Sequence, residues 1–169
     1  SDAQSLPRAW DSHYQAIFRA NVAISEIEGR TFIDELEELQ RVQFIAEAKW
    51  LRGWCYFNLV RLFGEVPMPL IPTTSVEGAQ LTKTSISEIY NQIISDLQTA
   101  ETDLPADPRI GPDIGRPFVG TAKFLLAKVY LTMAGQPVND ATRMSQAHSK
   151  IKEVIDNSGA YGYQLLSSY

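Results

Sequence analysis

Residues 44–64 read FIAEAKWLRGWCYFNLVRLFG, and this stretch decides the fold. Before the final Gly64, Gly53 is the only residue in it that disfavours a helix, so we predict one helix of about 30 Å here. From Trp50 onward, apolar side chains occupy more than one face, which is typical of a helix covered from several sides. We therefore predict a central packing helix with Trp50 and Trp54 in the core.

The composition indicates a soluble globular protein of 169 residues, with 44% hydrophobic and 21% charged residues and a net charge of −5. Lys and Arg are scattered, so we expect no nucleic-acid partner. The single cysteine, Cys55, cannot form an internal disulfide and is interpreted as a small buried core residue. No apolar run reaches the roughly 18 residues of a membrane span, and residues 1–10 lack a signal pattern.

Helical periodicity and capping signals place the other helices around this central one. A first helix is expected over residues 6–28, with Pro7 in its first turn and Gly29 after its end. The second begins at Ile33 or Asp34 and continues through the central stretch to residue 64. Three more are expected: one near Ser85 with a capping box to Glu88, one over 119–134, and one from Asn139 or Asp140 to 157.

The connecting segments are marked by proline and glycine. Pro67, Pro69 and Pro72 exclude a helix and predict an extended insertion at 65–84, whose apolar residues we expect to lie against the helices. Residues 107–117, DPRIGPDIGRP, predict a loop. The aromatic tail from residue 160 is expected to dock on the helices.

The central helix is repeated 74 residues later, because residues 48–51 (AKWL) align with 122–125 (AKFL). The alignment continues in three further pairs: Gly53 with Ala127, Tyr56 with Tyr130, and Phe57 with Leu131. Antiparallel helix pairs that stack in this way predict an all-α, tetratricopeptide-like α-α superhelix in a single domain, 1–169, with a generic helical bundle as the alternative. A third pair that is only half built would expose an apolar face, so we expect a fragment of a larger protein.

Catalytic and metal-binding signals are weak. His13 and His148 are far apart in sequence, and neither has a second ligand at metal spacing, so we predict no metal site and no cofactor. Residues 111–116 fail as a phosphate loop, because Gly115 is followed by Arg-Pro rather than Lys-Ser/Thr. No catalytic residue is predicted.

Acidic and aromatic residues are the candidates for a sugar site in this sequence. Glu35, Glu37 and Glu38 fall in the first turns of a helix, where a solvated face is favoured over a glycosidase pair. Trp10, like Trp50 and Trp54, is interpreted as packing. The segments 65–84 and 107–117 contain no Trp or Tyr that could form a sugar platform.

Several blocks in a fixed order resemble the helical part of SusD/RagB-type proteins. The first is W-x-x-x-Y…N, here Trp10, Tyr14 and Asn21, and the second is residues 46–70, AEAKWLRGWCYFNLVRLFGEVPMPL. The later blocks are Ser85-x-x-Glu-Ile-Tyr, Asp96-Leu97, Gly115-Arg116, TAKFLLAKVYLTMAG at 121–135, Val154-Ile155, Gly159-Ala-Tyr161 and Leu165. The match covers nearly the whole chain.

This resemblance implies a cell-surface, lipid-anchored nutrient-binding protein of the outer membrane of Bacteroidetes-type bacteria. Such lipoproteins capture glycans and pass them to a TonB-dependent (SusC-like) transporter, without catalytic activity. The family's signal peptide, lipidated N-terminal cysteine and large C-terminal region are absent from this sequence. We therefore expect the glycan-contacting residues, which remain unknown, to lie outside these 169 residues. A peptide-binding tetratricopeptide adaptor is the alternative function, and an enzyme is a more distant third.

Overall fold

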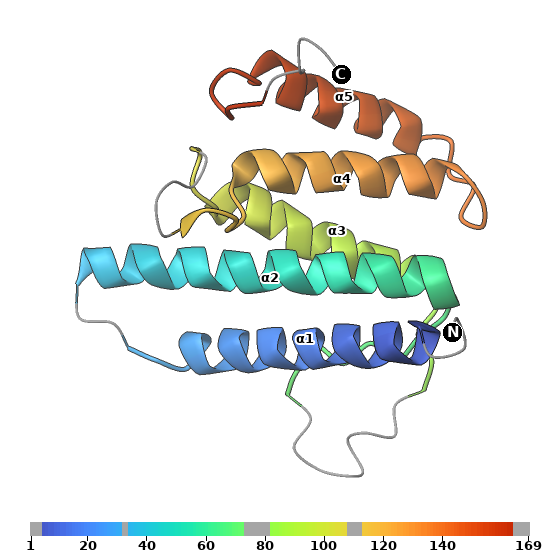
Figure 1. Cartoon of the computed structure of the whole chain (residues 1–169), viewed down its shortest axis with the longest axis horizontal. Coiled ribbons are helices and arrows are strands. Elements are labelled where there is room, and N and C mark those ends of the chain that lie inside the picture. The colour runs from blue at the N-terminus through green and yellow to red at the C-terminus, as the bar shows by residue number, and fades with distance from the viewer. Residues whose placement is uncertain (1–4, 32–33, 73–81, 108–112, 164–169) are drawn as a thin grey trace. The chain divides into compact units, whose positions relative to one another are not determined.

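The computed structural model describes residues 5–31, 34–72, 82–107 and 113–163. In these ranges all the regular structure is helical, and one isolated β-bridge joins Val66 to Thr84. The helices are α1 (Ser5–Glu28), α2 (Glu35–Phe63), α3 (Ile86–Asp103), α4 (Val119–Ala134) and α5 (Arg143–Asp156) (Figure 1). The prediction of an all-α chain is confirmed.

The chain divides into two compact units, Ser1–Asp96 and Leu97–Tyr169, and the boundary falls within α3. Each unit contains one closely packed pair of helices, α1 with α2 in the first and α4 with α5 in the second. Whether the two units together form the single domain predicted over residues 1–169 stays a prediction.

In the first unit, α1 and α2 lie side by side and run in opposite directions (Figure 1). The predicted ends of α2 are confirmed. Asp34 caps its start by accepting a hydrogen bond from the backbone N–H of Glu37 at 2.9 Å. Gly64, at φ 70°, ends the helix in a conformation that favours glycine, and its N–H donates to the carbonyl of Val60.

The capping box predicted for the third helix is also present. The backbone N–H of Glu88 donates to Ser85 Oγ at 3.3 Å, and the backbone N–H of Ser85 donates to Glu88 Oε2 at 3.3 Å. The apolar face that follows is buried, and its Tyr90 ring packs against Phe57 of α2 with centroids 6.4 Å apart.

The central helix α2 is less enclosed than predicted. Cys55 is fully buried, as expected, and burial raises the pKa of its thiol to about 12. Trp54, however, is 40% exposed, with its ring stacked on His13 at a centroid distance of 5.6 Å. The prediction that Trp54 belongs to the core is therefore wrong. Leu51 and Leu62 of the same helix are also exposed.

In the second unit, α4 begins and ends where predicted, but α5 begins later. Asn139 adopts a left-handed φ of 55°, which a helical residue cannot have. The carboxylate of Asp140 accepts hydrogen bonds from the Thr142 N–H at 3.1 Å and hydroxyl at 2.6 Å, so it closes a turn instead of capping the helix. The prediction of a start at Asn139 or Asp140 is wrong, and the first helical residue is Arg143.

Ion pairs link α4 and α5 to the end of α3. Lys123 Nζ lies 2.6 Å from Glu153, and Lys150 Nζ lies 2.6 Å from Glu101. The hydrogen bond to Glu153 raises the pKa of Lys123. These four partly buried groups form one network, which favours a single register of the three segments.

The predicted docking of the aromatic tail is confirmed at Tyr161, which is buried against Phe118 with ring centroids 5.6 Å apart. Both rings lie over Gly120. A Cβ atom there would meet Phe118 Cε2 at 2.6 Å and the Tyr161 ring at 3.0 Å. The tail can approach α4 because this helical position carries no side chain.

Replacing Gly120 by alanine should therefore lower the free energy of unfolding by about 1–3 kcal/mol, the usual cost of overpacking. Gly159→Ala is the matched control, because nothing lies within 4 Å of its added Cβ. Urea unfolding monitored by far-UV circular dichroism measures both variants. Equal stability of the two would contradict this packing.

Candidate functional site

The first candidate site is the extended segment that follows α2, residues 66–72. An extended backbone cannot satisfy its own carbonyl groups, so it needs donors from elsewhere when it is buried. Here the donors are side chains of α1 and α2. We call the four that donate to these carbonyls the carbonyl clamp: Tyr14, Asn21, Arg52 and Tyr56.

The two tyrosines hold the proline carbonyls. Tyr14 Oη donates to the carbonyl of Pro67 at 2.6 Å, and Tyr56 Oη donates to that of Pro69 at 2.7 Å. Burial raises the pKa of both phenols above their usual range. Both hydroxyls therefore stay protonated at physiological pH and remain hydrogen-bond donors.

The amide and the guanidinium complete the clamp. Asn21 Nδ2 donates to the carbonyl of Pro69 at 2.9 Å, and Arg52 Nη1 donates to that of Leu70 at 3.2 Å. Arg52 Nη1 also donates to Asn21 Oδ1 at 2.8 Å, so the two side chains fix each other.

Arg52 is held in turn by Asp96 of α3 through a bidentate ion pair. Its Nε and Nη2 atoms donate to the two carboxylate oxygens, each at 2.8 Å. Both residues are at most 5% exposed. Burial lowers the pKa of Arg52, but the hydrogen bonds and charge of Asp96 outweigh it, and the net shift is upward. Gln92 donates a further hydrogen bond to Asp96 at 3.0 Å.

This arrangement positions a backbone and does not resemble a reaction centre. The carboxylate of Asp96 is fully engaged by Arg52 and Gln92. The side chains of Leu70 and Ile71 lie exposed on the outer side of the segment. The prediction that the apolar side chains of the insertion lie against the helices is confirmed for Val66, which is fully buried, and is wrong for Leu70 and Ile71. The polar clamp holds this part of the insertion by its carbonyls. Residues 73–81 of the insertion lie outside the described residues.

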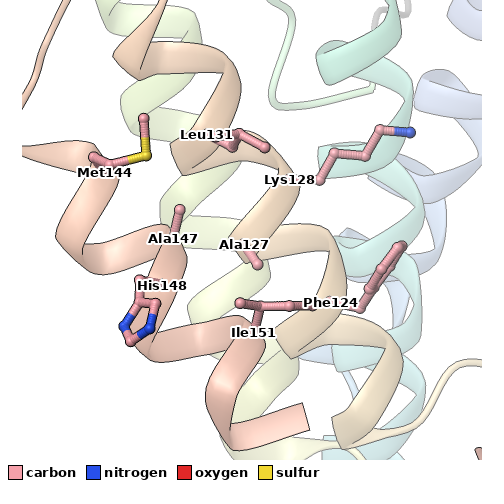
Figure 2. A pocket seen from close by; sticks show the side chains of 8 residues that line it. All are labelled: Phe124, Ala127, Lys128, Leu131, Met144, Ala147, His148 and Ile151. Carbon is pink, nitrogen blue, oxygen red and sulfur yellow. The ribbon is translucent and has the colours of Figure 1, made fainter. Parts of the chain in front are cut away.

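The second candidate site is a groove of about 370 Å³ between α4 and α5. Figure 2 shows the side chains that line it on the two helices. Ala127 and Ala147 form its floor, and the larger residues Phe124, Leu131, Met144 and Ile151 form its walls. Lys128 and His148 are exposed at its rim, and Lys128 points away from α5 (Figure 2). With no polar atom lining the interior, the groove is suited to apolar side chains and poorly suited to sugar hydroxyls.

The residues weighed for metal binding and acid–base chemistry are not brought together. Among the residues that the structure describes, no group of three His, Cys, Asp or Glu could hold a metal ion. His13 stacks on Trp54 in the first unit, and His148 lies on the rim of the groove in the second. Glu35 and Glu38 are exposed at the start of α2, where Glu38 pairs with Arg41 at 2.6 Å.

The predicted loop over 107–117 is described only in part. In that part Gly115 has a φ of 90°, and Asp113 pairs with Arg116 at 2.8 Å. Residues 108–112 lie outside the described residues. In the described ranges, no helix is both long and apolar enough to cross a membrane.

Sequence reasoning missed the clamp, although its signal was present. Asn21 lies on the apolar face of the first predicted helix, and Asp96 lies between Ile93 and Leu97 on that of the third. Arg52 interrupts the most apolar helix. Polar side chains at buried positions need hydrogen-bond or ion-pair partners. Contacts among these three residues could therefore have been predicted from the sequence.

The fold and the two candidate sites define an all-α scaffold built from packed helix pairs. Comparison with known proteins supports this class. The sequence model of a family described as "Starch-binding associating with outer membrane" matches residues 1–131. The chain therefore belongs to the SusD-like family.

Individual relatives agree. A SusD-like protein of Formosa agariphila is 36% identical over 157 residues, which are 92% of this chain and 28% of the relative. A SusD superfamily structure from Parabacteroides distasonis has a TM-score of 0.83 at 31% identity, covering 95% of this chain and 33% of that one. A laminarin-binding SusD-like protein has a TM-score of 0.77 at 36% identity, covering 94% and 32%. The tetratricopeptide-like fold is thus confirmed, and the chain spans about a third of the length of these relatives.

Replacing Arg52 by methionine should destabilise the protein by about 3–5 kcal/mol, because it leaves the carboxylate of Asp96 buried and unpaired. The double variant R52M/D96L should be less destabilised than R52M, since it removes both charges. Arg41→Met, which breaks an exposed ion pair on the same helix, should leave the urea midpoint unchanged.

Hydrogen exchange of the same variants tests the clamp itself. Amides of the non-proline residues in 66–71 should exchange faster in R52M than in the parent protein, and no faster in Arg41→Met. Unchanged exchange rates in this segment would show that Arg52 does not hold it in place.

Proposed function

We propose that this chain is the helical scaffold of a non-enzymatic, glycan-binding protein on the outer-membrane surface. The protein is lipid-anchored in its full-length form and delivers its ligand to a TonB-dependent, SusC-like transporter. The observation that carries the proposal is the agreement with the laminarin-binding SusD-like protein over 94% of the chain. The family description, starch binding in association with the outer membrane, supports the same ligand class and location.

The geometry supports a division of labour within that protein. The described residues contain no cluster suited to metal or acid–base chemistry, and the groove lacks the polar groups that recognise sugars. The clamp fixes a backbone segment and does not open a cleft. We propose that the glycan-contacting residues belong to the part of the protein outside this chain, and that the helices provide a rigid frame.

The frame also offers surfaces for a partner protein. The outer face of α3 is polar throughout its length, with these exposed residues: Ser87, Glu88, Asn91, Ser95, Gln98 and Thr102. The outer face of α1 is polar except at Leu6 and Phe18. Polar surfaces of this kind suit a protein that must associate with a transporter and remain soluble. A peptide-binding adaptor is less well supported, because the described groove is short and apolar.

Glycan binding can be tested with the full-length protein in affinity gels that contain laminarin or starch. The protein should be retarded by at least one polysaccharide, because binding slows its migration, and it should release no reducing sugar on incubation. A matched gel without polysaccharide is the control. Release of reducing ends would identify an enzyme, and migration unaffected by any glycan would contradict the proposed ligand class.

The partner surface can be tested with Asn91→Arg, which places a bulky charge at the middle of the exposed face of α3. The full-length variant should lose most of its co-purification with the transporter and keep its glycan binding. Ser149→Arg, on an exposed position of α5, is the control and should change neither. Unaffected co-purification of Asn91→Arg would exclude this face, and lost glycan binding would contradict the division of labour.

A further inference from the structure

The end of α1 and the start of α2 lie beside each other (Figure 1), and a cavity of about 430 Å³ opens between them. Its apolar part is formed by Ile27 of α1 and Phe44 of α2, and Phe44 is 41% exposed. Leu36, one turn before the lining residue Gln40 on the same side of α2, is 65% exposed. Exposed apolar side chains beside a cavity with a polar rim are typical of a protein–protein contact surface. We call Ile27, Leu36, Gln40 and Phe44 the turn patch.

The negative charge of the chain is concentrated around the turn patch. Residues 26–41 include six acidic residues and two arginines, so they carry −4 of the chain's net charge of −5. Arg41 is already neutralised by Glu38, whose carboxylate oxygens accept hydrogen bonds from its Nε at 2.8 Å and its Nη2 at 2.6 Å. Glu26 and Glu28 are exposed and form no ion pair among the residues that the structure describes. The rim of the patch therefore carries carboxylates without counter-ions.

Glu26 and Glu28 also lie where their charge is unfavourable. Both fall in the last turn of α1, which contains no basic residue. The C-terminal end of a helix carries a partial negative charge, so carboxylates there oppose the helix dipole. The acidic first turn of α2, which includes Glu35, adds like charge nearby in the sequence. Local charges that oppose their own helix, without a compensating contact in the fold, are expected mainly at functional sites.

The sign of this charge restricts the class of molecule that the turn patch can bind. Nucleic acid and anionic lipid are repelled by it, and a neutral sugar supplies no counter-charge. In the described part of the chain, no group of three His, Cys, Asp or Glu is arranged to hold a metal ion. A protein surface that carries Lys or Arg around an apolar side chain complements both the rim and the cavity.

We propose that the turn patch is a docking site for a basic surface of the transporter, an inference that rests on the proposed function. Lys or Arg side chains of the partner pair with Glu26 and Glu28, and an apolar side chain fills the cavity beside Phe44. Such charges attract the partner over about 8–10 Å at physiological ionic strength and so raise the association rate. The exposed face of α3 carries a single charged residue, Glu88, and adds little to this attraction.

Neutralising the two carboxylates tests the proposal with the full-length protein and the detergent-solubilised transporter. At about 50 mM NaCl, E26Q/E28Q should associate roughly three to ten times more slowly than the parent protein in biolayer interferometry. The control E65Q/D107N removes two exposed carboxylates outside the patch, and its rate should stay within about twofold of the parent's. Association of E26Q/E28Q at the parent's rate would overturn the proposal.

Two further measurements separate docking from folding. The melting temperature of E26Q/E28Q should equal or exceed that of the parent protein, because negative charge leaves the negative end of α1. A lower melting temperature would show that the carboxylates support the fold, and would overturn the proposal. Raising NaCl to about 500 mM should slow association of the parent to roughly the rate of E26Q/E28Q, and a rate insensitive to salt would also overturn it.

The apolar part of the patch is tested by Leu36→Ser. This variant should dissociate from the transporter at least about three times faster than the parent, since lost interface contacts act mainly on dissociation. Leu62→Ser is the matched control, because Leu62 is 54% exposed near the other end of α2, and its dissociation rate should not change. Equal rates for the two variants would overturn the proposal. If the parent protein does not bind the transporter, the proposed function fails as well. If the parent binds and the patch variants bind equally well, the docking site alone is wrong.

Discussion

The buried ion pair between Arg52 and Asp96 is the interaction on which the first unit depends. Two charges can be taken out of water only when their geometry is good and their remaining hydrogen-bonding groups find partners. Here the guanidinium uses one edge for Asp96 of α3 and the other for Asn21 of α1 and the carbonyl of Leu70. One side chain thus specifies where α1, α3 and the extended segment lie against α2. An apolar residue of similar size could stabilise this core, but it would not fix the path of the backbone.

The two candidate sites show opposite solutions to the same physical problem. Extended backbone can be buried in the first unit because hydroxyl, amide and guanidinium groups donate hydrogen bonds to its carbonyls. The groove in the second unit has an apolar lining instead. The first site accepts a segment without regular structure, and the second accepts only one that has satisfied its own hydrogen bonds. The two copies of the repeat are therefore both built from helix pairs, but the first presents polar donors and the second an apolar lining.

Much of the fold could be predicted from local signals. Helix ends set by local chemistry were found, such as the Ser85–Glu88 capping box and Gly64, since their partners are a few residues away. The start of α5 was missed because Asp140 can close a turn as well as cap a helix, and only the left-handed Asn139 decides between them. The exposure of Trp54 and the pairing of Arg52 with Asp96 depend on contacts distant in sequence. Helical periodicity shows which residues share a face but does not show what covers that face.

The prolines of the clamped segment have a consequence for aggregation. An exposed extended backbone is normally a template for another strand, because it offers alternating donors and acceptors along its edge. In residues 66–72, three prolines remove donors, and the carbonyls of Pro67, Pro69 and Leu70 are already bonded inward. The segment can therefore expose apolar side chains such as Ile71 without offering a regular edge for intermolecular β-pairing.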